Sequence, residues 1–448
     1  MEISLEGAGR KTTVLIAGVA VFAILAIQAS ELWLGDYRIH SNNIDQMERG
    51  AALLPGDAQA WDLLGHYYQW DFTHSDVPRA LEDYRHAVRD NPLDADYWID
   101  VASASEATGD DADARQAFTR AQAAYPASAE VDFYYGNFLL RQQEYPAAYA
   151  QLRRAAVADP KLLPVVISRV WRANEDVNQM LDQVLPANVD AYVDALDFFC
   201  AGHRADEALM VWERMRQLGK PIQLDEAFPL MDELIHEDRA EEATRAWREA
   251  LMAAGLPNEG PTGGSLIWNG NFKQEFAEGG LGWRWDSPGD TSIDFDSQAG
   301  PNGSRAVRLD FTGGANIAID APYEYVAVAP NQRYHFHASM RTEDITTESG
   351  MRFAIADPNH ADAVNVVTDG VTGTTPWTPV EADVSTGSDT HFLVVRLARY
   401  PSRLFDNKLG GTVWIADLSL APSSGAAPNP ASDSPTGNGG AAGEPPTP

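Results

Sequence analysis

The sequence predicts a multidomain chain: one N-terminal transmembrane helix, an all-α helical-repeat solenoid, an all-β sandwich and a disordered C-terminal tail. Three observations support this fold class. An uncharged apolar run lies near the N-terminus, prolines and alanines recur at a fixed interval in the middle of the chain, and short β-branched and aromatic runs alternate with turn residues after it. A chain of 448 residues is long enough for two or three domains.

Charge narrows the class of partner. The chain has 33 basic and 65 acidic residues, which gives a formal net charge of −32. An excess of this size repels the phosphates of nucleic acid, so it argues against nucleic acid as a partner. The single cysteine, Cys200, cannot form an intramolecular disulfide and is expected in the core. Cysteine usage therefore does not define the compartment.

Residues 13–34 are predicted to form a transmembrane helix. The run has no charged residue between Lys11 and Glu31, and about 20 apolar residues span a bilayer core. A cleaved secretory signal is the alternative. Ile27 interrupts the small-x-small pattern of a cleavage site, however, and Trp33 is typical of an interfacial anchor, so we expect an uncleaved span.

The flanks of this span predict its orientation. Arg10 and Lys11 precede it and an acidic segment follows it, which favours a cytoplasmic residue range 1–12. We therefore expect a single-pass protein of the inner (cytoplasmic) membrane with its C-terminal part on the periplasmic side. Residues 35–56 are expected to form a connecting helix.

The middle of the chain repeats every 34 residues. Pro92, Pro126 and Pro160 mark the period, and each is preceded at fixed distances by two alanines and one bulky apolar residue. A helical hairpin needs small residues where its helices cross, a bulky residue on its second helix and a proline where that helix ends. The residues that keep step with the prolines are Ala80, Tyr84 and Ala87, then Ala114, Phe118 and Ala121, then Ala148, Leu152 and Ala155.

This pattern resembles the tetratricopeptide repeat (TPR). The segment Trp61 to Tyr68 and the pair Tyr135-Gly136 agree with the first-helix pattern of that family. We expect five recognisable repeats across residues 57–256 and one degenerate repeat at 162–186. The resemblance implies stacked helical pairs whose concave groove binds partner proteins.

After a Gly/Pro-rich linker at 257–264, residues 265–421 are predicted to form a two-sheet β-sandwich of about eight to ten strands. The tail, residues 422–448, consists almost only of small residues and proline, so we expect it to be disordered. The clearest expected strands are Ala306–Phe311, Ile317–Ala321, Tyr334–Met340, Met351–Ala356, Phe392–Leu397 and Thr412–Leu420.

Both ends of this domain resemble carbohydrate-binding modules of the galactose-binding-like, jelly-roll type. The matching segments are Asn269-Gly270-Asn271-Phe272 with Gly282–Trp285 at the start and Gly411–Leu420 at the end. The resemblance implies a glycan ligand and a structural calcium ion held by Asn269, Asn271 and Asp417. Lys273 stands where such modules carry a glutamate, and its charge opposes the ion. No other cofactor is expected.

Exposed aromatic side chains are the candidates for sugar contact, because the C–H faces of sugar rings pack on aromatic planes. Trp377 and Tyr400, each beside a proline in an expected loop, are the predicted ligand-binding residues. Most of the other aromatic residues of the domain, including Trp283, are expected in the core.

The sequence contains no recognisable catalytic motif. The pair His335 and His337 could ligate a metal, and the pair Asp294 and Asp296 could serve glycoside hydrolysis. Ordinary strand residues explain both pairs more simply, so we predict a protein that is not an enzyme.

The predicted function is a membrane-anchored, non-catalytic scaffold. Its TPR array would bind protein partners and its sandwich would bind glycan or another cell-envelope component, in exopolysaccharide or surface assembly. Two alternatives stay open: a glycosidase- or lyase-like enzyme that uses the β domain, and a purely structural envelope protein. Convergent carboxylates or histidines in a folded cleft would favour the enzyme.

Overall fold

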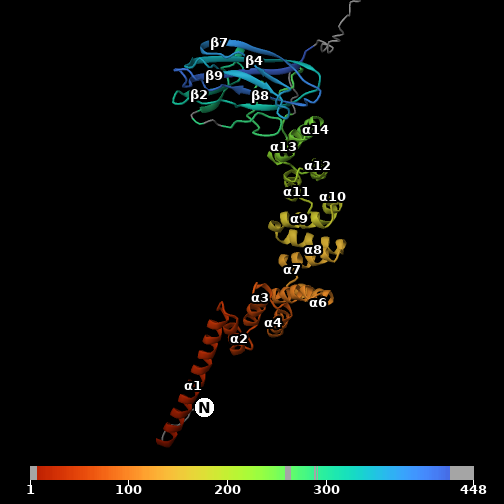
Figure 1. Cartoon of the computed structure of the whole chain (residues 1–448), viewed down its shortest axis with the longest axis vertical. Helices are drawn as coiled ribbons and strands as arrows, with labels where there is room; N and C mark the ends of the chain where they lie inside the picture. Colours follow the sequence, from red (N-terminus) through yellow and green to blue (C-terminus); the bar gives the residue numbers. More distant parts are fainter. Residues whose placement is uncertain (1–7, 258–263, 287–288, 290, 424–448) are drawn as a thin grey trace, which may run out of the picture. The chain divides into compact units, whose positions relative to one another are not determined.

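The computed structural model describes residues 8–257, 264–286, 289 and 291–423 (Figure 1). Most of the predicted linker 257–264, and all of the tail 422–448 beyond residue 423, lie outside the described residues, as do residues 1–7. The chain divides into two compact units, residues 1–198 and 199–448. The predicted order of an apolar helix, helical pairs and antiparallel sheets is confirmed.

Helix α1 (Ala8–Ile39) contains the apolar run. An 18-residue window within Lys11–Ile39 has a mean hydropathy of 2.2, and α1 is the only helix of the described residues that is long and apolar enough to cross a membrane. Its last turns pack on α2 (Ile44–Leu53), where a Cβ on Gly50 would lie 2.7 Å from the backbone nitrogen of Ile39. The predicted connecting helix 35–56 is therefore the end of α1 followed by α2.

Six helical pairs follow within the described residues. The fourth, predicted to be degenerate, has a short second half that ends in the π-helical segment Met180–Val184. The pairs are α3 (Ala58–Trp70) and α4 (Val77–Asp90), α5 (Ala95–Ala107) and α6 (Asp111–Ala124), α7 (Ala129–Arg141) and α8 (Tyr145–Ala158), α9 (Leu163–Ala173) and α10 (Val177–Gln179), α11 (Val189–Ala201) and α12 (Ala205–Gln217), and α13 (Phe228–His236) and α14 (Ala240–Ala253).

Small residues set the spacing within each hairpin. The six alanines that keep step with the prolines have no exposed surface. At Gly65 and Gly136 an added Cβ would lie 2.6 Å from the side chains of Tyr84 and Leu152 respectively, so the second helix fills the space that glycine leaves. Asp57, Asp94 and Ser128 begin the three first helices by accepting hydrogen bonds from backbone N–H groups of the first turn.

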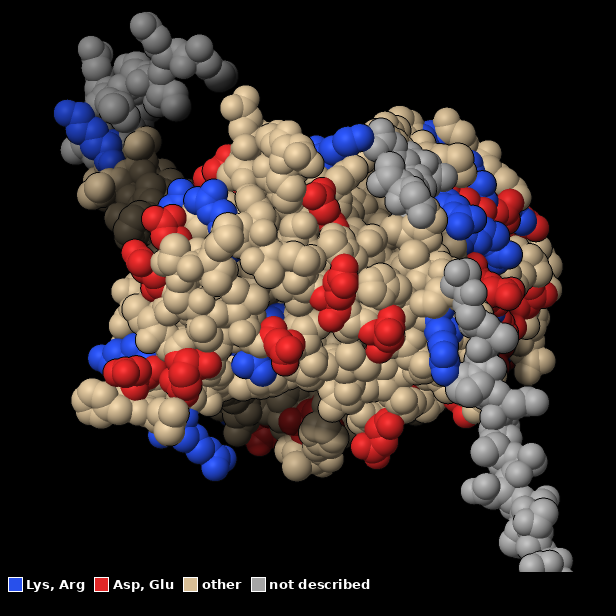
Figure 2. All heavy atoms as spheres, turned by 90° about the horizontal axis from the view of Figure 1, so that it is seen from above, with Lys and Arg blue, Asp and Glu red and all other residues tan. Residues whose placement is uncertain are grey.

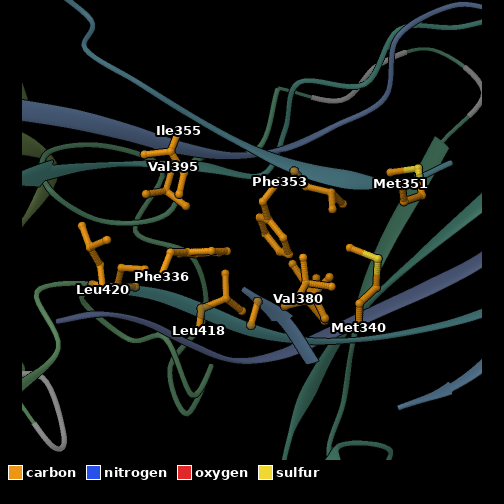
Figure 3. Packing of buried hydrophobic residues seen from close by; sticks show 14 of the residues in the cluster. Phe336, Met340, Met351, Phe353, Ile355, Val380, Val395, Leu418 and Leu420 are labelled. Atoms are coloured by element: carbon orange, nitrogen blue, oxygen red, sulfur yellow. The ribbon is translucent and has the colours of Figure 1, made fainter. Parts of the chain in front are cut away.

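The C-terminal region is an antiparallel sandwich with strand orders β1-β2-β9-β4-β7 and β3-β8-β5-β6. Apolar side chains of both sheets meet between them; Figure 3 shows Phe353 and Phe336 facing each other, with ring centroids 5.0 Å apart. The strands are β1 (Thr291–Asp296), β2 (Ala306–Thr312), β3 (Tyr323–Ala327), β4 (Arg333–Ile345), β5 (Arg352–Ala356), β6 (Asn365–Val367), β7 (Gly373–Ser385), β8 (Phe392–Ala398) and β9 (Gly410–Pro422).

The two ends of the domain meet, as the resemblance implies. Leu266 donates a backbone hydrogen bond to Leu420, and Leu418 donates one to Gly270. A Cβ on Gly270 would lie 2.1 Å from the carbonyl oxygen of Leu418, so this contact requires glycine.

Two strand predictions need correction. The run Ile317–Ala321 forms only an isolated bridge from Ile319 to Arg399. The long edge strand β7 went unrecognised because it carries two prolines, Pro376 and Pro379, and few apolar residues. An edge strand tolerates proline because one row of its backbone groups needs no partner in the sheet.

The last helical pair packs on the sandwich within the second unit. Arg284 forms an ion pair with Asp232 of α13 at 2.6 Å, and Nδ1 of His391 is within hydrogen-bond distance of Oδ2 of Asp238, also at 2.6 Å. The rings of Trp247 and Trp268 meet edge to face with centroids 5.7 Å apart. Independent folding of residues 262–421 stays a prediction. A fragment without α14 would lose the contact of Trp247 with Trp268.

Glu324 of β3 is a fully buried carboxyl group at this junction. Its side chain is 1% exposed; Oε1 accepts a hydrogen bond from the backbone N–H of Trp268, and Oε2 has no partner among the described residues. Burial raises the pKa of Glu324 well above its usual value of 4.5. The folded state therefore keeps a proton that the unfolded state releases.

This difference predicts a pH dependence. As pH rises above 4.5, Glu324 should cost the folded state about 1.4 kcal/mol per pH unit until the raised pKa is reached. Glu324→Gln should remove that slope from chemical-denaturation curves measured across this range. The exposed Glu275→Gln variant serves as control, and equal slopes in all three proteins would contradict the prediction.

Candidate functional site

A groove of 390 Å³ runs along the first helices of three successive repeats, α3, α5 and α7. It combines carboxylates with aromatic rings, of which Trp70 is 67% exposed and Tyr134 is 45% exposed. Because each repeat contributes one first helix, side chains distant in sequence meet on one surface. The polar and exposed aromatic residues that matter below are His66, Trp70, Asp96, Asp100, Glu130 and Tyr134.

One end of the groove has a histidine between two aspartates. Nε2 of His66 lies 3.7 Å from Oδ2 of Asp62 and 3.3 Å from Oδ2 of Asp100. Burial and the charge of Asp100 raise the pKa of Asp62 to about 7. Ligand atoms in a tetrahedral zinc site are about 3.3–3.5 Å apart. These three residues are thus the group that could hold a divalent metal ion.

Two further groove carboxylates, Asp96 and Glu130, have no basic partner among the described residues. Burial, with the neighbouring Asp94 and Asp100, raises the pKa of Asp96; burial, with Asp96 and Asp100, raises that of Glu130. No lysine or arginine of the described residues forms an ion pair with Asp96, Asp100 or Glu130. By contrast, among the coloured residues on the face drawn in Figure 2, acidic and basic side chains are dispersed.

The solvent-facing side of the five-stranded sheet is a second candidate surface. Trp414 of β9 lies between Arg308 of β2 and Arg341 of β4, its cross-strand neighbours, whose guanidinium carbons are 5.7 and 4.0 Å from the ring centroid. Trp377 packs beside this group. Planar guanidinium groups and indole rings therefore lie next to one another on one face of the five-stranded sheet.

The histidine and aspartate pairs do not converge on a common centre. His335 lies opposite Asp383 at 2.9 Å and His337 opposite Glu381 at 3.3 Å, so each has its own cross-strand partner. Asp294 accepts a hydrogen bond from the backbone of Phe295, and Asp296 accepts two in the following turn.

The two predicted sugar-contact residues lie in different settings. Trp377 is part of β7 rather than a loop; it is half-buried and its indole N–H donates to the carbonyl of Ala299 at 3.0 Å. Tyr400 follows β8 and is 48% exposed. The guanidinium carbon of Arg352 lies 5.7 Å from its ring centroid.

The three predicted calcium ligands lie where the two ends of the domain meet. Asp417 stands at a bulge of β9 and precedes Leu418, whose N–H donates to Gly270, the residue between Asn269 and Asn271. Asn269 uses its side-chain oxygen and nitrogen on the backbone of Gln274, and the Asn271 oxygen accepts from the N–H of Lys273. Binding of calcium there stays a prediction.

The sequence reasoning overlooked the acidic groove and the buried Arg399. Asp96 and Glu130 are separated by the repeat period and so occupy the same position in successive first helices. A comparison of those positions would have revealed the groove. Nothing in the sequence marks Arg399, whose partners come from distant loops.

Comparisons with known proteins agree with the helical-repeat class. Residues 72–129 and 112–162 match the family model described as "Tetratricopeptide repeat". The match lies within the helical pairs, and a β-sandwich follows them. No curated protein matches the chain.

Several solved structures are similar to parts of the chain. "Crystal structure of MamA" has 15% identity and a TM-score of 0.26, and covers 39% of this chain and 86% of its own. "Crystal structure of MamA protein" has 15% identity and a TM-score of 0.28, with coverages of 43% and 91%. "CBM4 structure and function" has 13% identity and a TM-score of 0.26, with coverages of 35% and 99%.

Proposed function

We propose that this protein is a membrane-anchored, non-catalytic scaffold. Its TPR array binds a protein partner, and its sandwich binds glycan or another cell-envelope component in surface or exopolysaccharide assembly. The observation that supports the proposal most is the groove of α3, α5 and α7, which exposed Trp70 and Tyr134 line together with several carboxylates. Exposed aromatic rings in a concave surface are typical anchors for a partner.

Photo-cross-linking tests the groove. A photoreactive amino acid at Tyr134, in the full chain in its native membrane, should form adducts with a discrete protein. The same group at Val157, an exposed residue of the second helix α8, is the matched control. Identical adducts from both positions would contradict groove binding.

The apolar helix supports the membrane anchor. We expect the protein to stay with membranes during high-salt and carbonate extraction. Replacing Val21 and Leu25, both exposed on α1, by arginine should release it, because each arginine costs about 2.5–3.5 kcal/mol at the centre of a membrane helix. A soluble wild-type form that begins near Ser30 would show cleavage and contradict the anchor.

Glycan binding is supported by the aromatic and arginine side chains at the sandwich surface. Tyr400→Ala should weaken binding of envelope polysaccharide fragments about tenfold, the equivalent of ~1.4 kcal/mol, while leaving the melting temperature unchanged. Trp377→Ala should weaken it similarly, with a loss of stability because its ring is half-buried.

Trp283→Ala is the control for a core position, since this ring has no exposed surface. It should lower the free energy of unfolding by about 3–5 kcal/mol. If the wild-type protein binds nothing on a broad glycan array, with or without calcium, the sandwich is better explained as a protein-contact module.

The enzyme alternative has less support. Among the described residues of the sandwich, no group of three histidine, cysteine or acidic ligand atoms comes together; the group at Asp62 lies in the helical array. The predicted acid and histidine pairs bind their own neighbours, which favours the non-catalytic proposal.

A further inference from the structure

We propose that the groove of α3, α5 and α7 takes arginine or lysine side chains from a basic, extended segment of the partner protein. This inference rests on the proposed function, since it concerns the protein bound in that groove, and it adds the chemistry by which the partner is chosen. Recognition would combine the carboxylates that line the groove with its two exposed aromatic rings.

The charge pattern of the helical array singles out the groove. Elsewhere, acidic residues of one repeat are paired with arginines of another: Arg85 with Asp113 at 2.8 Å, and Arg115 with Glu144 at 2.6 Å. Even within the groove, Arg141 is occupied by two hydrogen bonds to Glu106. Asp96 and Glu130 have no such arginine or lysine partner within the described residues, so their charge is available to an incoming cation.

The carboxylates are close enough to act together. Asp96, Asp100 and Glu130 line the same groove and come from two successive first helices, α5 and α7. Neighbouring negative charges in one groove define a site where a cation gains more than it would at an isolated surface carboxylate. The array therefore has a negatively charged groove whose carboxylates Asp96 and Glu130 are not paired with its own arginines or lysines among the described residues.

The aromatic rings favour a guanidinium or ammonium group attached to a peptide. Trp70 of α3 and Tyr134 of α7 both line the groove, on either side of the α5 carboxylates in chain order. A cation can pack on such rings while it bonds the acids. At 390 Å³ the groove falls in the usual ~300–1,000 Å³ range of ligand pockets.

Fluorescence anisotropy with the detergent-solubilised full chain tests the charge. The probe is a fluorescein-labelled peptide of alternating arginine and alanine. Its matched controls replace arginine by citrulline, which keeps the shape without the charge, or by glutamate. The arginine peptide should bind, with an affinity that falls about tenfold or more as NaCl rises from ~50 to ~500 mM, and the controls should not bind.

Substitutions of the groove carboxylates test whether the peptide binds in the groove. Asp96→Asn with Glu130→Gln should weaken binding at least about tenfold, because two charge-assisted contacts are lost. Glu82→Gln with Asp111→Asn removes the same charge from exposed positions outside the groove and should leave the affinity unchanged. Unchanged melting temperatures of both double variants will show that the array remains folded.

Three results would overturn the proposal: equal binding of the citrulline peptide, equal affinities of the two double variants, or saturation of the groove by Zn²⁺ without any arginine-peptide binding. The last would identify the cation as a metal held by Asp62, His66 and Asp100. Failure of the charge proposal remains distinct from failure of groove binding. If cross-linking at Tyr134 persists in the Asp96→Asn, Glu130→Gln variant, the groove still binds a protein and only the charge proposal fails. If the wild-type array forms no adducts at Tyr134, groove binding itself is rejected.

Discussion

Replacing Gly136 by tryptophan is expected to destabilise the first unit by about 3 kcal/mol or more. A Cβ at this position would lie 2.6 Å from Cγ of Leu152 and 3.2 Å from its backbone nitrogen. Because the backbone of α8 forms part of the obstruction, a rotamer change cannot make room for an indole ring. The two helices of the third repeat would have to separate, and every residue of their crossing would lose contacts.

Thermal unfolding followed by circular dichroism measures this loss. Gly56→Trp is the control, since a Cβ at Gly56 meets nothing within 4 Å and its backbone needs no positive φ. An unfolding profile of Gly136→Trp that matches the wild type would mean that the helices of this repeat do not pack as described.

Replacing Arg399 by methionine is expected to cost the sandwich about 3 kcal/mol or more. Its side chain has no exposed surface, and its guanidinium donates hydrogen bonds to Ser349, Asn316, Ile317, Thr347 and Asn407. Three of those acceptors are backbone carbonyls, and each buried acceptor left without a donor costs about 1–3 kcal/mol. The loops beside Tyr400 would lose their common anchor.

Arg399→Lys should recover only part of the stability, because an ammonium group cannot reproduce the planar fork of five donors. Arg403→Met is the matched control, since Arg403 is exposed in the same loop. Denaturant unfolding followed by tryptophan fluorescence compares the three variants. If Arg399→Met and Arg403→Met have equal stabilities, the network does not hold the loops.

Much of the architecture is predictable because it depends on local periodicity. A hairpin of two helices needs its alanines, its glycine and its terminal proline at fixed positions, so Ala114, Phe118 and Pro126 indicate a repeat without knowledge of any distant contact. The β region is harder to delimit. Strand β7 pairs with β4 across a long connection, and its prolines hide it from local propensity.

The candidate sites likewise differ in how far local sequence predicts them. Tyr400 and Asn269 could be proposed from short motifs, although motifs alone do not show that Asn269 bonds Gln274 or that Trp377 is half-buried on a strand. The groove requires three helices to be placed beside one another before Asp62, Asp100 and Glu130 become neighbours. The raised pKa values of Asp62 and Glu130 arise from burial and from the charge of nearby acids such as Asp100, which have no counterpart in the extended chain.

By itself, the sequence determined the apolar helix, the repeat period, the change from helix to strand and the acidic character, because each depends on residues near one another in the chain. Only the tertiary structure decided which charges remain unpaired. Arg141 forms an ion pair with Glu106 across the repeat period, whereas Asp96 and Glu130 form none with an arginine or lysine of the described residues. Whether a carboxylate is paired depends on its distance in space from a basic side chain. A difference of a few ångströms decides whether its charge is neutralised or is free to bind a cation.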